Sequence, residues 1–210
     1  KEKIYEGQMS ASIYPRPLRR QKSLTQNIVY ISPTRHASGE VFLGEVLNRP
    51  DLYEEMLSIL KEFDENILSI NYDKNNFGRG TYKILSKSNN KALPLNVYGD
   101  GMKKAILLMS AVVKANDGIL LLDEFETAIH TSAMERTFKW ILETCKKLNV
   151  QVFMTSHSIE AISKVLKCCP DMEKDIRMIT LVETLNGIKA RNVDAAKAIK
   201  LKEQYGLELR

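Results

Sequence analysis

The chain has 210 residues, of which 44% are hydrophobic and 27% charged, and its formal net charge is +5. This is an ordinary globular composition, sufficient for one good core or two small lobes, and its mild basicity permits a nucleotide or nucleic-acid partner without requiring one. The three cysteines show no CxxC or Cys/His metal spacing, which argues against a disulfide framework and favours a reducing cytosol. The apolar runs are too short to cross a bilayer, and no signal-peptide pattern opens the chain, which begins without Met. We therefore expect a cytoplasmic protein without a membrane partner.

The first half of the chain predicts a basic arm, helices and then antiparallel strands. Within residues 1–26, Arg16 to Lys22 form a basic cluster that either belongs to a solvated loop or arm or contacts phosphates. Apolar spacing and turn residues predict the following elements: a strand over 27–32, helices over 38–48 and 51–63, and strands over 66–73, 81–87 and 92–97.

The stretch YGDGMKK begins at Tyr98 and leads directly into an apolar helix pattern. Gly99 and Gly101 leave the backbone free to approach a ligand closely. The helix N-terminus offers unpaired N–H groups and a partial positive charge to an anion, to which Lys103 and Lys104 add their own charges. The alternative is that Asp100 simply caps the helix.

The segment GILLLDEFETAIH, from Gly118 to His130, contains four consecutive apolar residues followed by two acids. Such a run predicts a strand buried on both faces of a parallel sheet, and ligands bind at the carboxyl ends of such strands. Asp123 is suited to hold Mg²⁺, and Glu124 is suited to orient or deprotonate an attacking water. The alternative is that Asp123 only caps the turn after the strand.

A second apolar strand, over 150–155, ends at a polar histidine. A long helix starting near Thr131 separates the two strands, so a right-handed crossover would make them parallel. His157 would then share one crevice with Asp123 and Glu124. The alternative is a capping or structural histidine.

The end of the chain predicts a hairpin and a helix. Strands over 176–185 and 188–193 flank Asn186 and Gly187, a strong two-residue turn signal, and Asp194 caps the last helix. The expected fold is therefore α/β, with a largely parallel sheet flanked by helices. We divide it into an N-terminal arm with helical and antiparallel segments (1–97) and a C-terminal lobe (98–210), although one continuous domain is also possible.

The three stretches YGDGMKK, ILLLDE with FETAIH, and FMTSHS occur in this order at close spacing. Together they resemble the C-terminal half of an ABC-type ATPase head with a P-loop NTPase fold. The pattern is most similar to the OLD-like and related AAA ATPases of bacteria, many of which are tied to phage defence, and more distantly to SMC-type and RecF-type heads. The resemblance is strongest from Tyr98 to Ile162.

This resemblance implies a role for each matching residue. Gly99, Asp100 and Gly101 match the signature motif, which touches the γ-phosphate of a nucleotide held by the opposing subunit, although the usual LSGGQ form is absent. The remaining matches are Asp123 as the Walker B acid that positions Mg²⁺, Glu124 as the catalytic glutamate, Glu126 to His130 as the D-loop region, and His157 as the switch histidine. The implied ligands are ATP and Mg²⁺, with Lys103 and His130 among the ATP-binding residues. The implied partners are a second head, an effector protein and, optionally, nucleic acid.

The sequence lacks the phosphate-binding GxxxxGK[ST] motif, and GRGTYK at Gly78 to Lys83 has the wrong spacing and a strand predicted after it. We favour a fragment of a working ATPase over a degenerate one, because a dead enzyme has no chemical need for Glu124 and His157. A non-hydrolysing module that dimerises or binds DNA is the alternative function. A nuclease has no support in these residues.

Overall fold

The computed structural model describes residues 27–74, 80–89, 91–184 and 187–205, with side chains described up to residue 200. Two features of the sequence analysis lie outside these ranges, the basic cluster of Arg16 to Lys22 and the turn residue Asn186. The predictions made for them stay predictions.

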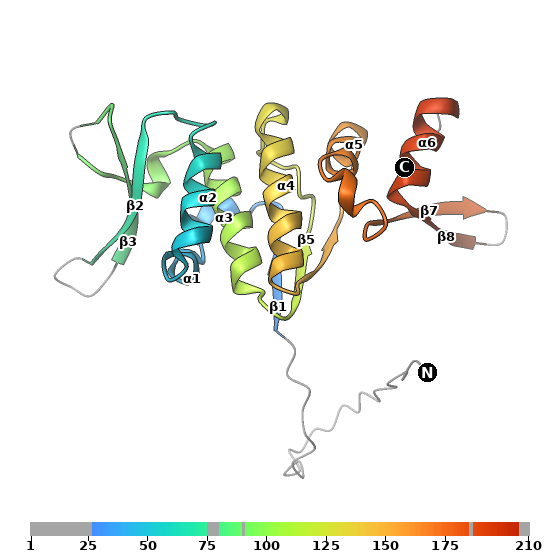
Figure 1. Cartoon of the computed structure of the whole chain (residues 1–210), viewed down its shortest axis with the longest axis horizontal. Helices are drawn as coiled ribbons and strands as arrows, with labels where there is room; N and C mark the ends of the chain where they lie inside the picture. Colours follow the sequence, from blue (N-terminus) through green and yellow to red (C-terminus); the bar gives the residue numbers. More distant parts are fainter. Residues whose placement is uncertain (1–26, 75–79, 90, 185–186, 206–210) are drawn as a thin grey trace, which may run out of the picture.

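A three-stranded parallel sheet lies at the centre of the molecule (Figure 1). Its strands are β1 (Ile28–Ile31), β5 (Ile119–Leu122) and β6 (Gln151–Met154), in the order β1-β5-β6. Ile119 pairs with Ile28 on one side and with Gln151 on the other, so all three strands end at the same edge. The predicted parallel arrangement is therefore confirmed.

Three helices follow or connect these strands: α3 (Asp100–Lys114), α4 (Thr131–Lys147) and α5 (Ile159–Lys167). The sheet residues beneath the helices are fully buried, among them Ile31 and Leu120. Phe138 of α4 packs edge-on against Phe125, with ring centroids 4.8 Å apart, and links this helix to the segment after β5. One face of the sheet thus belongs to the main core.

None of the described helices or strands covers the opposite face of the sheet. Ile28, Tyr30 and Phe153 are 56%, 49% and 49% exposed, and the central residues Ile119 and Leu121 are only half-buried. Within the described residues, the prediction of a β5 strand buried on both faces is therefore wrong. The continuous apolar pattern of the strand is present, but only one layer of helices covers it.

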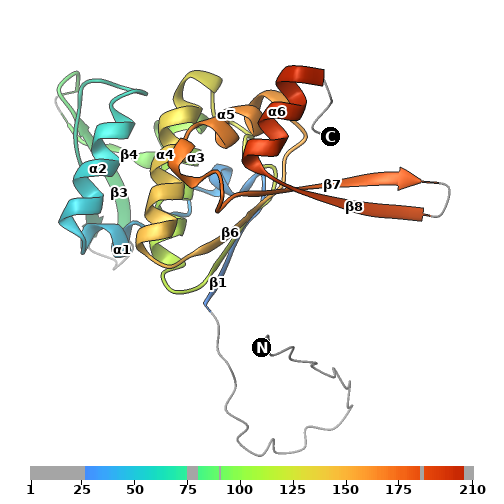
Figure 2. The same cartoon turned by 45° about the vertical axis from the view of Figure 1, so that its right-hand side comes forward.

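The segment between β1 and α3 forms the predicted antiparallel meander, preceded by two helices (Figures 1 and 2). The helix predicted over 38–48 is much shorter, because Gly39 adopts a left-handed conformation (φ +71°) and ends a 3-10 turn. The elements are η1 (Arg35–Ser38), α1 (Leu43–Leu47), α2 (Pro50–Leu60), β2 (Ile67–Lys74), β3 (Gly80–Ser86), β4 (Leu93–Pro94) and η2 (Leu95–Val97).

The C-terminal part comprises η3 (Pro170–Met172), the hairpin of β7 (Arg177–Thr184) and β8 (Gly187–Asp194), and α6 (Ala195–Tyr205). Asp194 accepts a hydrogen bond from the Lys197 backbone N–H at 2.7 Å, which confirms the predicted cap. Figure 2 shows the hairpin extending away from the body of the molecule. None of the helices in the described ranges is long and apolar enough to span a membrane.

Candidate active site

Backbone hydrogen bonds fix the segment after β5 between its two neighbouring strands. The Asp123 N–H donates to the Ile31 carbonyl at 3.0 Å, which prolongs the pairing with β1. The Phe125 N–H donates to the Thr155 carbonyl at 3.1 Å, and the Thr155 N–H donates to the Leu122 carbonyl at 2.9 Å. The two acids that follow β5 therefore stand on backbone held from both sides, at the carboxyl edge of the sheet.

The Asp123 carboxylate is oriented by two hydroxyl groups. The Thr155 hydroxyl donates to Asp123 Oδ1 at 2.6 Å, and the Tyr30 hydroxyl approaches Asp123 Oδ2 at 3.5 Å. These partners come from β1 and from the end of β6, not from the N–H groups of the turn. The alternative that Asp123 caps its own turn is therefore wrong.

Glu124 has a backbone conformation that is unusual for its residue type. Its φ is +42°, in the left-handed region that costs a side chain with a Cβ free energy. Its N–H donates to the Thr155 hydroxyl at 2.9 Å, so this hydroxyl serves both acids. Strain of this kind persists where the surroundings impose it and is concentrated at functional sites.

His157 stands at the end of β6, and its Nε2 lies 3.7 Å from Glu124 Oε1. Its side chain is 88% exposed, and its backbone N–H donates to Glu126 Oε1 at 3.1 Å. Ser158, not His157, caps α5, because the Ser158 hydroxyl accepts the Ala161 N–H at 3.2 Å. The predicted proximity of the histidine to the acids is confirmed, and the capping alternative is wrong.

The signature-like residues form the start of α3, which begins at Asp100, ahead of the helix pattern in the sequence. Asp100 is not a cap. Its carboxylate is exposed and pairs with Lys103 Nζ at 2.7 Å, and this hydrogen bond holds the pKa of Asp100 below its usual range. Gly99 occupies the cap position without a side-chain hydrogen bond.

A close backbone approach joins this helix start to the D-loop-like segment. A Cβ atom on Gly101 would lie 3.0 Å from the Ala128 carbonyl oxygen. Two segments that the sequence places far apart, both of them matching motifs of the family pattern, are therefore neighbours. Gly99, by contrast, has open space around the position of a Cβ.

His130 has a local structural role that the sequence did not predict. It is the N-cap of α4, and its Nδ1 accepts the Ser132 N–H at 3.3 Å and lies 2.8 Å from the Ser132 hydroxyl. The structure brings it to the end of the D-loop-like segment, apart from the Asp123, Glu124 and His157 contacts described above.

Two residues of this region have contacts that the sequence analysis did not predict. Thr155 was only the last residue of a predicted strand. Lys104 was predicted, with Lys103, to offer its charge to an anion at the helix start, and its burial makes this prediction wrong. Lys104 is completely buried, and its Nζ donates to the Pro33 carbonyl at 3.1 Å. A sequence offers no signal for such contacts, because they join segments 32 and 71 positions apart.

The donor atoms at Asp123 fit a magnesium ion. Mg²⁺ prefers oxygen ligands and retains several waters, so one carboxylate with neighbouring hydroxyl oxygens suffices on the protein side. Within the described ranges, no cluster of three or more His, Cys, Asp or Glu side chains is arranged to hold a metal. The site is therefore suited to a cation shared with phosphate and water, and not to a metal enclosed by protein ligands.

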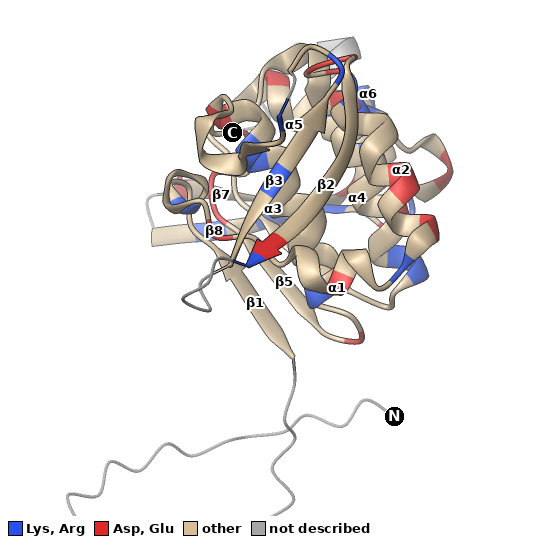
Figure 3. Ribbon diagram, turned by 90° about the vertical axis from the view of Figure 1, so that its left-hand side faces the viewer, with Lys and Arg blue, Asp and Glu red and all other residues tan. Residues whose placement is uncertain are grey.

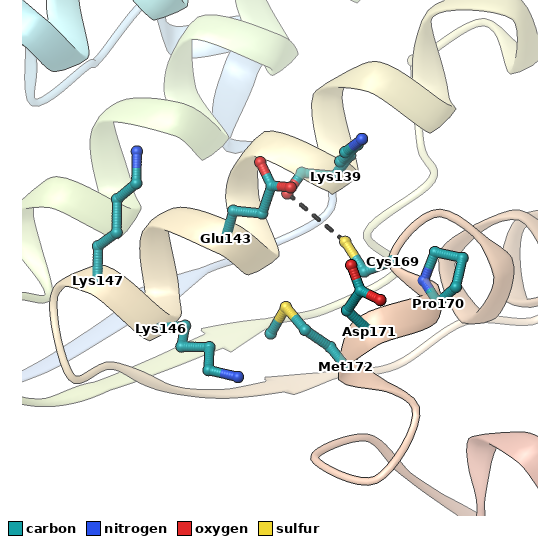
Figure 4. Close-up of a pocket in the computed structure, with 8 residues that line it drawn as sticks. All are labelled: Lys139, Glu143, Lys146, Lys147, Cys169, Pro170, Asp171 and Met172. Atoms are coloured by element: carbon teal, nitrogen blue, oxygen red, sulfur yellow. Dashed lines mark hydrogen bonds between the residues drawn. The ribbon is translucent and has the colours of Figure 1, made fainter.

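A separate cavity of about 340 Å³ lies between α4 and η3 (Figure 4). Its lining includes Lys139, Glu143, Cys169 and Asp171 and contains none of the predicted site residues. The side chains of Glu124 and His157, by comparison, are 43% and 88% exposed.

Two curated proteins are similar in sequence. An ATP/GTP phosphatase of Helicobacter pylori is 33% identical over 131 residues, which cover 60% of this chain and 34% of that protein. An uncharacterized protein of Methanocaldococcus jannaschii is 28% identical over 112 residues, which cover 53% of this chain and 98% of that protein. The chain thus spans about a third of the length of the Helicobacter relative.

Solved structures of SMC ATPase heads share the fold. One comes from work on ATP-driven dimerization and DNA stimulated activation of SMC ATPases; it matches with a TM-score of 0.50 and 14% identity over 74% of this chain and 91% of that chain. An SmcHead bound to the C-winged helix domain of ScpA matches with a TM-score of 0.50 and 12% identity over 80% of this chain and 52% of that chain. The chain therefore has an α/β fold of the P-loop NTPase type, as the sequence predicted.

Residues 14–163 match a family model described as "AAA domain, putative AbiEii toxin, Type IV TA system". The match covers well over half of the chain and includes all the site residues discussed above. The chain belongs to this family of AAA domains.

Proposed function

We propose that this chain is the part of an ABC-type ATPase that positions Mg²⁺ and the attacking water. The observation that carries the proposal is the joint placement of Asp123, Glu124 and His157, with Glu124 Oε1 3.7 Å from His157 Nε2 and Asp123 Oδ1 held by the Thr155 hydroxyl. Membership of an AAA family and the name of the Helicobacter relative support nucleotide hydrolysis.

Each side chain has a distinct task in this proposal. Asp123 would hold Mg²⁺, which supplies charge neutralisation at the phosphates. Because the Thr155 hydroxyl donates to Oδ1, the carboxylate is fixed before the ion binds. Glu124 would accept a proton from water, and the His157 ring would donate a hydrogen bond to the γ-phosphate. Catalysis of this kind depends on positioning and on preorganised charge.

In this proposal, the phosphate cradle comes from a segment outside these 210 residues. No GxxxxGK[ST] motif occurs in the sequence, and the GRG stretch leads into strand β3 and not into a helix. The uncovered sheet face supports this part of the proposal. It borders the acidic crevice, and one of its exposed residues, Tyr30, approaches Asp123 itself.

A second head would face the start of α3. Gly99, Asp100, Gly101 and Lys103 then approach the phosphates of a nucleotide held by that head, and the D-loop-like segment with His130 lies beside them. The reported ATP-driven dimerization of an SMC ATPase with this fold supports this arrangement. The family description, which names a putative toxin of a type IV system, supports control of an effector; an OLD-like role in phage defence in the cytoplasm extends this proposal.

ATP binding tests the proposal. We would titrate MgATP into the chain alone and into the chain joined to the P-loop-bearing segment of its native gene. The proposal predicts binding and turnover only by the joined protein. If the native gene supplies a P-loop and the joined protein still does not bind ATP, the chain is a non-hydrolysing module.

A further inference from the structure

A groove of about 700 Å³ lies between the β2–β3 hairpin and the segment 35–42 that follows β1. Leu95 and Asn96 of η2 complete its lining. The hairpin that forms one side of the groove faces the viewer in Figure 3. None of the described lining residues belongs to the candidate active site, so the proposed function leaves this groove unused.

The hairpin side of the groove carries an exposed tyrosine whose ring is held in place. Tyr72 of β2 is 47% exposed. Its ring lies directly over Gly80 of β3, where a Cβ atom would collide with it. It also packs against Tyr82, with ring centroids 5.0 Å apart and an angle of 53° between the ring planes. The hairpin therefore offers the groove an aromatic surface in a fixed orientation.

The segment after β1 adds a guanidinium group that is packed on an aromatic ring. Arg35 Cζ lies 5.2 Å from the centroid of the Phe42 ring. Arg35 Nη1 donates to the Tyr30 carbonyl at 2.8 Å, and Arg35 Nη2 pairs with Glu40 Oε2 at 3.3 Å. These contacts fix the plane of the guanidinium group, and Glu40 offsets its charge.

The charge and the chemistry of the lining limit the kind of ligand. Among the described lining residues, Arg35 and Glu40 are the only charged side chains, and they pair with each other. The groove therefore offers no net charge to the phosphates of a free nucleotide. Thr81 and Asn96 add neutral groups that donate and accept hydrogen bonds. A planar, uncharged group with donors and acceptors along its edge suits this lining.

We propose that the groove binds unpaired bases of a single-stranded nucleic acid. Bases stack on tyrosine rings and on guanidinium planes, and here Tyr72 and Arg35 provide both. The edge of a base meets Thr81 and Asn96. The volume of the groove exceeds that of one base, which favours consecutive bases of a strand over a single nucleoside. The phosphates of the strand remain outside the groove, on a chain whose formal net charge is +5.

A purely structural tyrosine makes a different prediction. Tyr72 would then only cover Gly80 and pack against Tyr82, as aromatic side chains do across neighbouring strands. Its replacement would lower the stability of the hairpin, and no nucleobase would bind in the groove.

NMR of the unaltered 210-residue chain distinguishes the two. We would add a short oligothymidylate strand, the duplex of this strand with oligoadenylate, or thymidine, at about 0.15 M salt, where electrostatic attraction alone is weakened. The strand should shift the amide resonances of Thr81 and Asn96 and bind more tightly than thymidine. The duplex, whose bases are paired and stacked, should leave these resonances unchanged. No shift with the strand, or equal affinities for the strand and thymidine or for the strand and the duplex, overturns the proposal.

Substitution of Tyr72 tests the role of its ring. Tyr72→Ala should weaken binding of the strand about 5- to 150-fold, the range that stacking of a base on an aromatic side chain implies. Tyr72→Phe retains the ring and should bind as the unaltered chain does. Phe153→Ala is the matched control, because Phe153 is 49% exposed and lies on the central sheet, outside the groove.

Unchanged affinity in a folded Tyr72→Ala protein overturns the proposal, because binding would then depend on the charge of the chain and not on this ring. If Tyr72→Ala does not fold, the resonances of Thr81 and Asn96 in the unaltered chain still decide. The inference is independent of the proposed function. Neither measurement uses ATP or Mg²⁺, so a failure of the ATPase proposal would be seen separately, in the ATP titration.

Discussion

At the scale of single residues, the Thr155 hydroxyl organises the candidate site. It donates to Asp123 Oδ1 and accepts the Glu124 N–H, so one oxygen fixes both the proposed metal ligand and the backbone of the proposed general base. Because Thr155 is exposed, water can replace part of these hydrogen bonds, so we expect its substitution to reduce the free energy of unfolding only moderately.

We predict that Thr155→Val lowers the free energy of unfolding by about 1–2 kcal/mol, since two hydrogen bonds at the acids are lost. In the joined protein it should also weaken Mg²⁺-dependent ATP binding. Urea unfolding and titration calorimetry measure the two effects. Thr144→Val is the control: the Thr144 hydroxyl is buried without a partner among the described residues, so its removal should be neutral or stabilising. Equal effects at both positions would contradict the account.

The backbone conformation of Glu124 should lower the stability of the fold. Its left-handed backbone should cost about 1 kcal/mol relative to glycine. We therefore predict that Glu124→Gly raises the free energy of unfolding relative to Glu124→Ala by about this amount, because both variants lack the carboxylate and only glycine relieves the φ of +42°. Chemical denaturation of the two variants gives the difference. Equal stabilities would mean that this conformation carries no strain.

The sequence predicted Asp123, Glu124 and His157 because each follows an apolar strand, and strand ends meet at one edge of a parallel sheet. It could not predict Thr155 as their organiser or Glu126 as the partner of the His157 N–H. Those roles depend on the register between β5 and β6 and on side-chain directions after each strand. The left-handed backbone conformation of Glu124 could not be predicted either, because a positive φ at a non-glycine residue has no sequence signal.

At the scale of elements, the first turn of α3 and the segment after β5 pack backbone against backbone. Gly101→Ala should lower the free energy of unfolding by about 1–2 kcal/mol, because the new methyl group would lie 3.0 Å from the Ala128 carbonyl oxygen. This is the opposite of the usual gain for alanine within a helix. Gly99→Ala, with open space at its Cβ, is the matched control. Thermal unfolding measures the stabilities of the two variants. A Gly101→Ala protein as stable as the control would contradict this close packing.

Helix ends were the least predictable part of the elements. The apolar pattern of α3 is clear only from Lys104 onward, yet the helix starts at Asp100, because Asp100 and Lys103 pair within its first turn. At α4, the sequence predicted a helix starting near Thr131, and the structure adds His130 as its N-cap.

The cysteines in α4 and after α5 are structural. Burial raises the pKa of Cys145 to about 12, and it also raises the pKa of both Cys168 and Cys169. Because the thiolate is the reactive form, we predict that all three thiols react far more slowly with iodoacetamide at pH 8 in the folded protein than in urea. Mass spectrometry of the alkylated protein measures this. Rapid alkylation of Cys169, which lines the cavity between α4 and η3, would show that this cavity opens.

At the scale of the whole molecule, the two faces of the sheet are unequal. Charged residues of both signs are spread over the helices and the meander (Figure 3), as expected of a surface in contact with water. The sheet face of Ile28, Tyr30 and Phe153 is apolar instead, and Leu181 and Ile188 of the hairpin are also exposed. Exposed apolar surface of this kind marks an interaction site, in agreement with the proposal that a P-loop-bearing segment completes the fold.

The fold class was predictable because the hydrophobic periods of strands and helices are explicit in the sequence, and because the order β5, α4, β6 allows few topologies. The uncovered face was not predictable. A continuous apolar strand pattern predicts that both faces of the strand are buried. It does not show which part of the chain supplies the layer that covers each face.

The central claim is that Glu124 acts on water beside an Asp123-bound magnesium ion, and turnover by Glu124→Gln tests it most directly. In the protein joined to its P-loop segment, we predict that this variant binds MgATP normally, accumulates as an ATP-bound dimer and hydrolyses ATP about 10²–10⁴-fold more slowly, the usual contribution of a general base. Glu160→Gln, which alters an exposed glutamate paired with Lys164, should turn over at the unaltered rate. Wild-type turnover by Glu124→Gln would contradict the account.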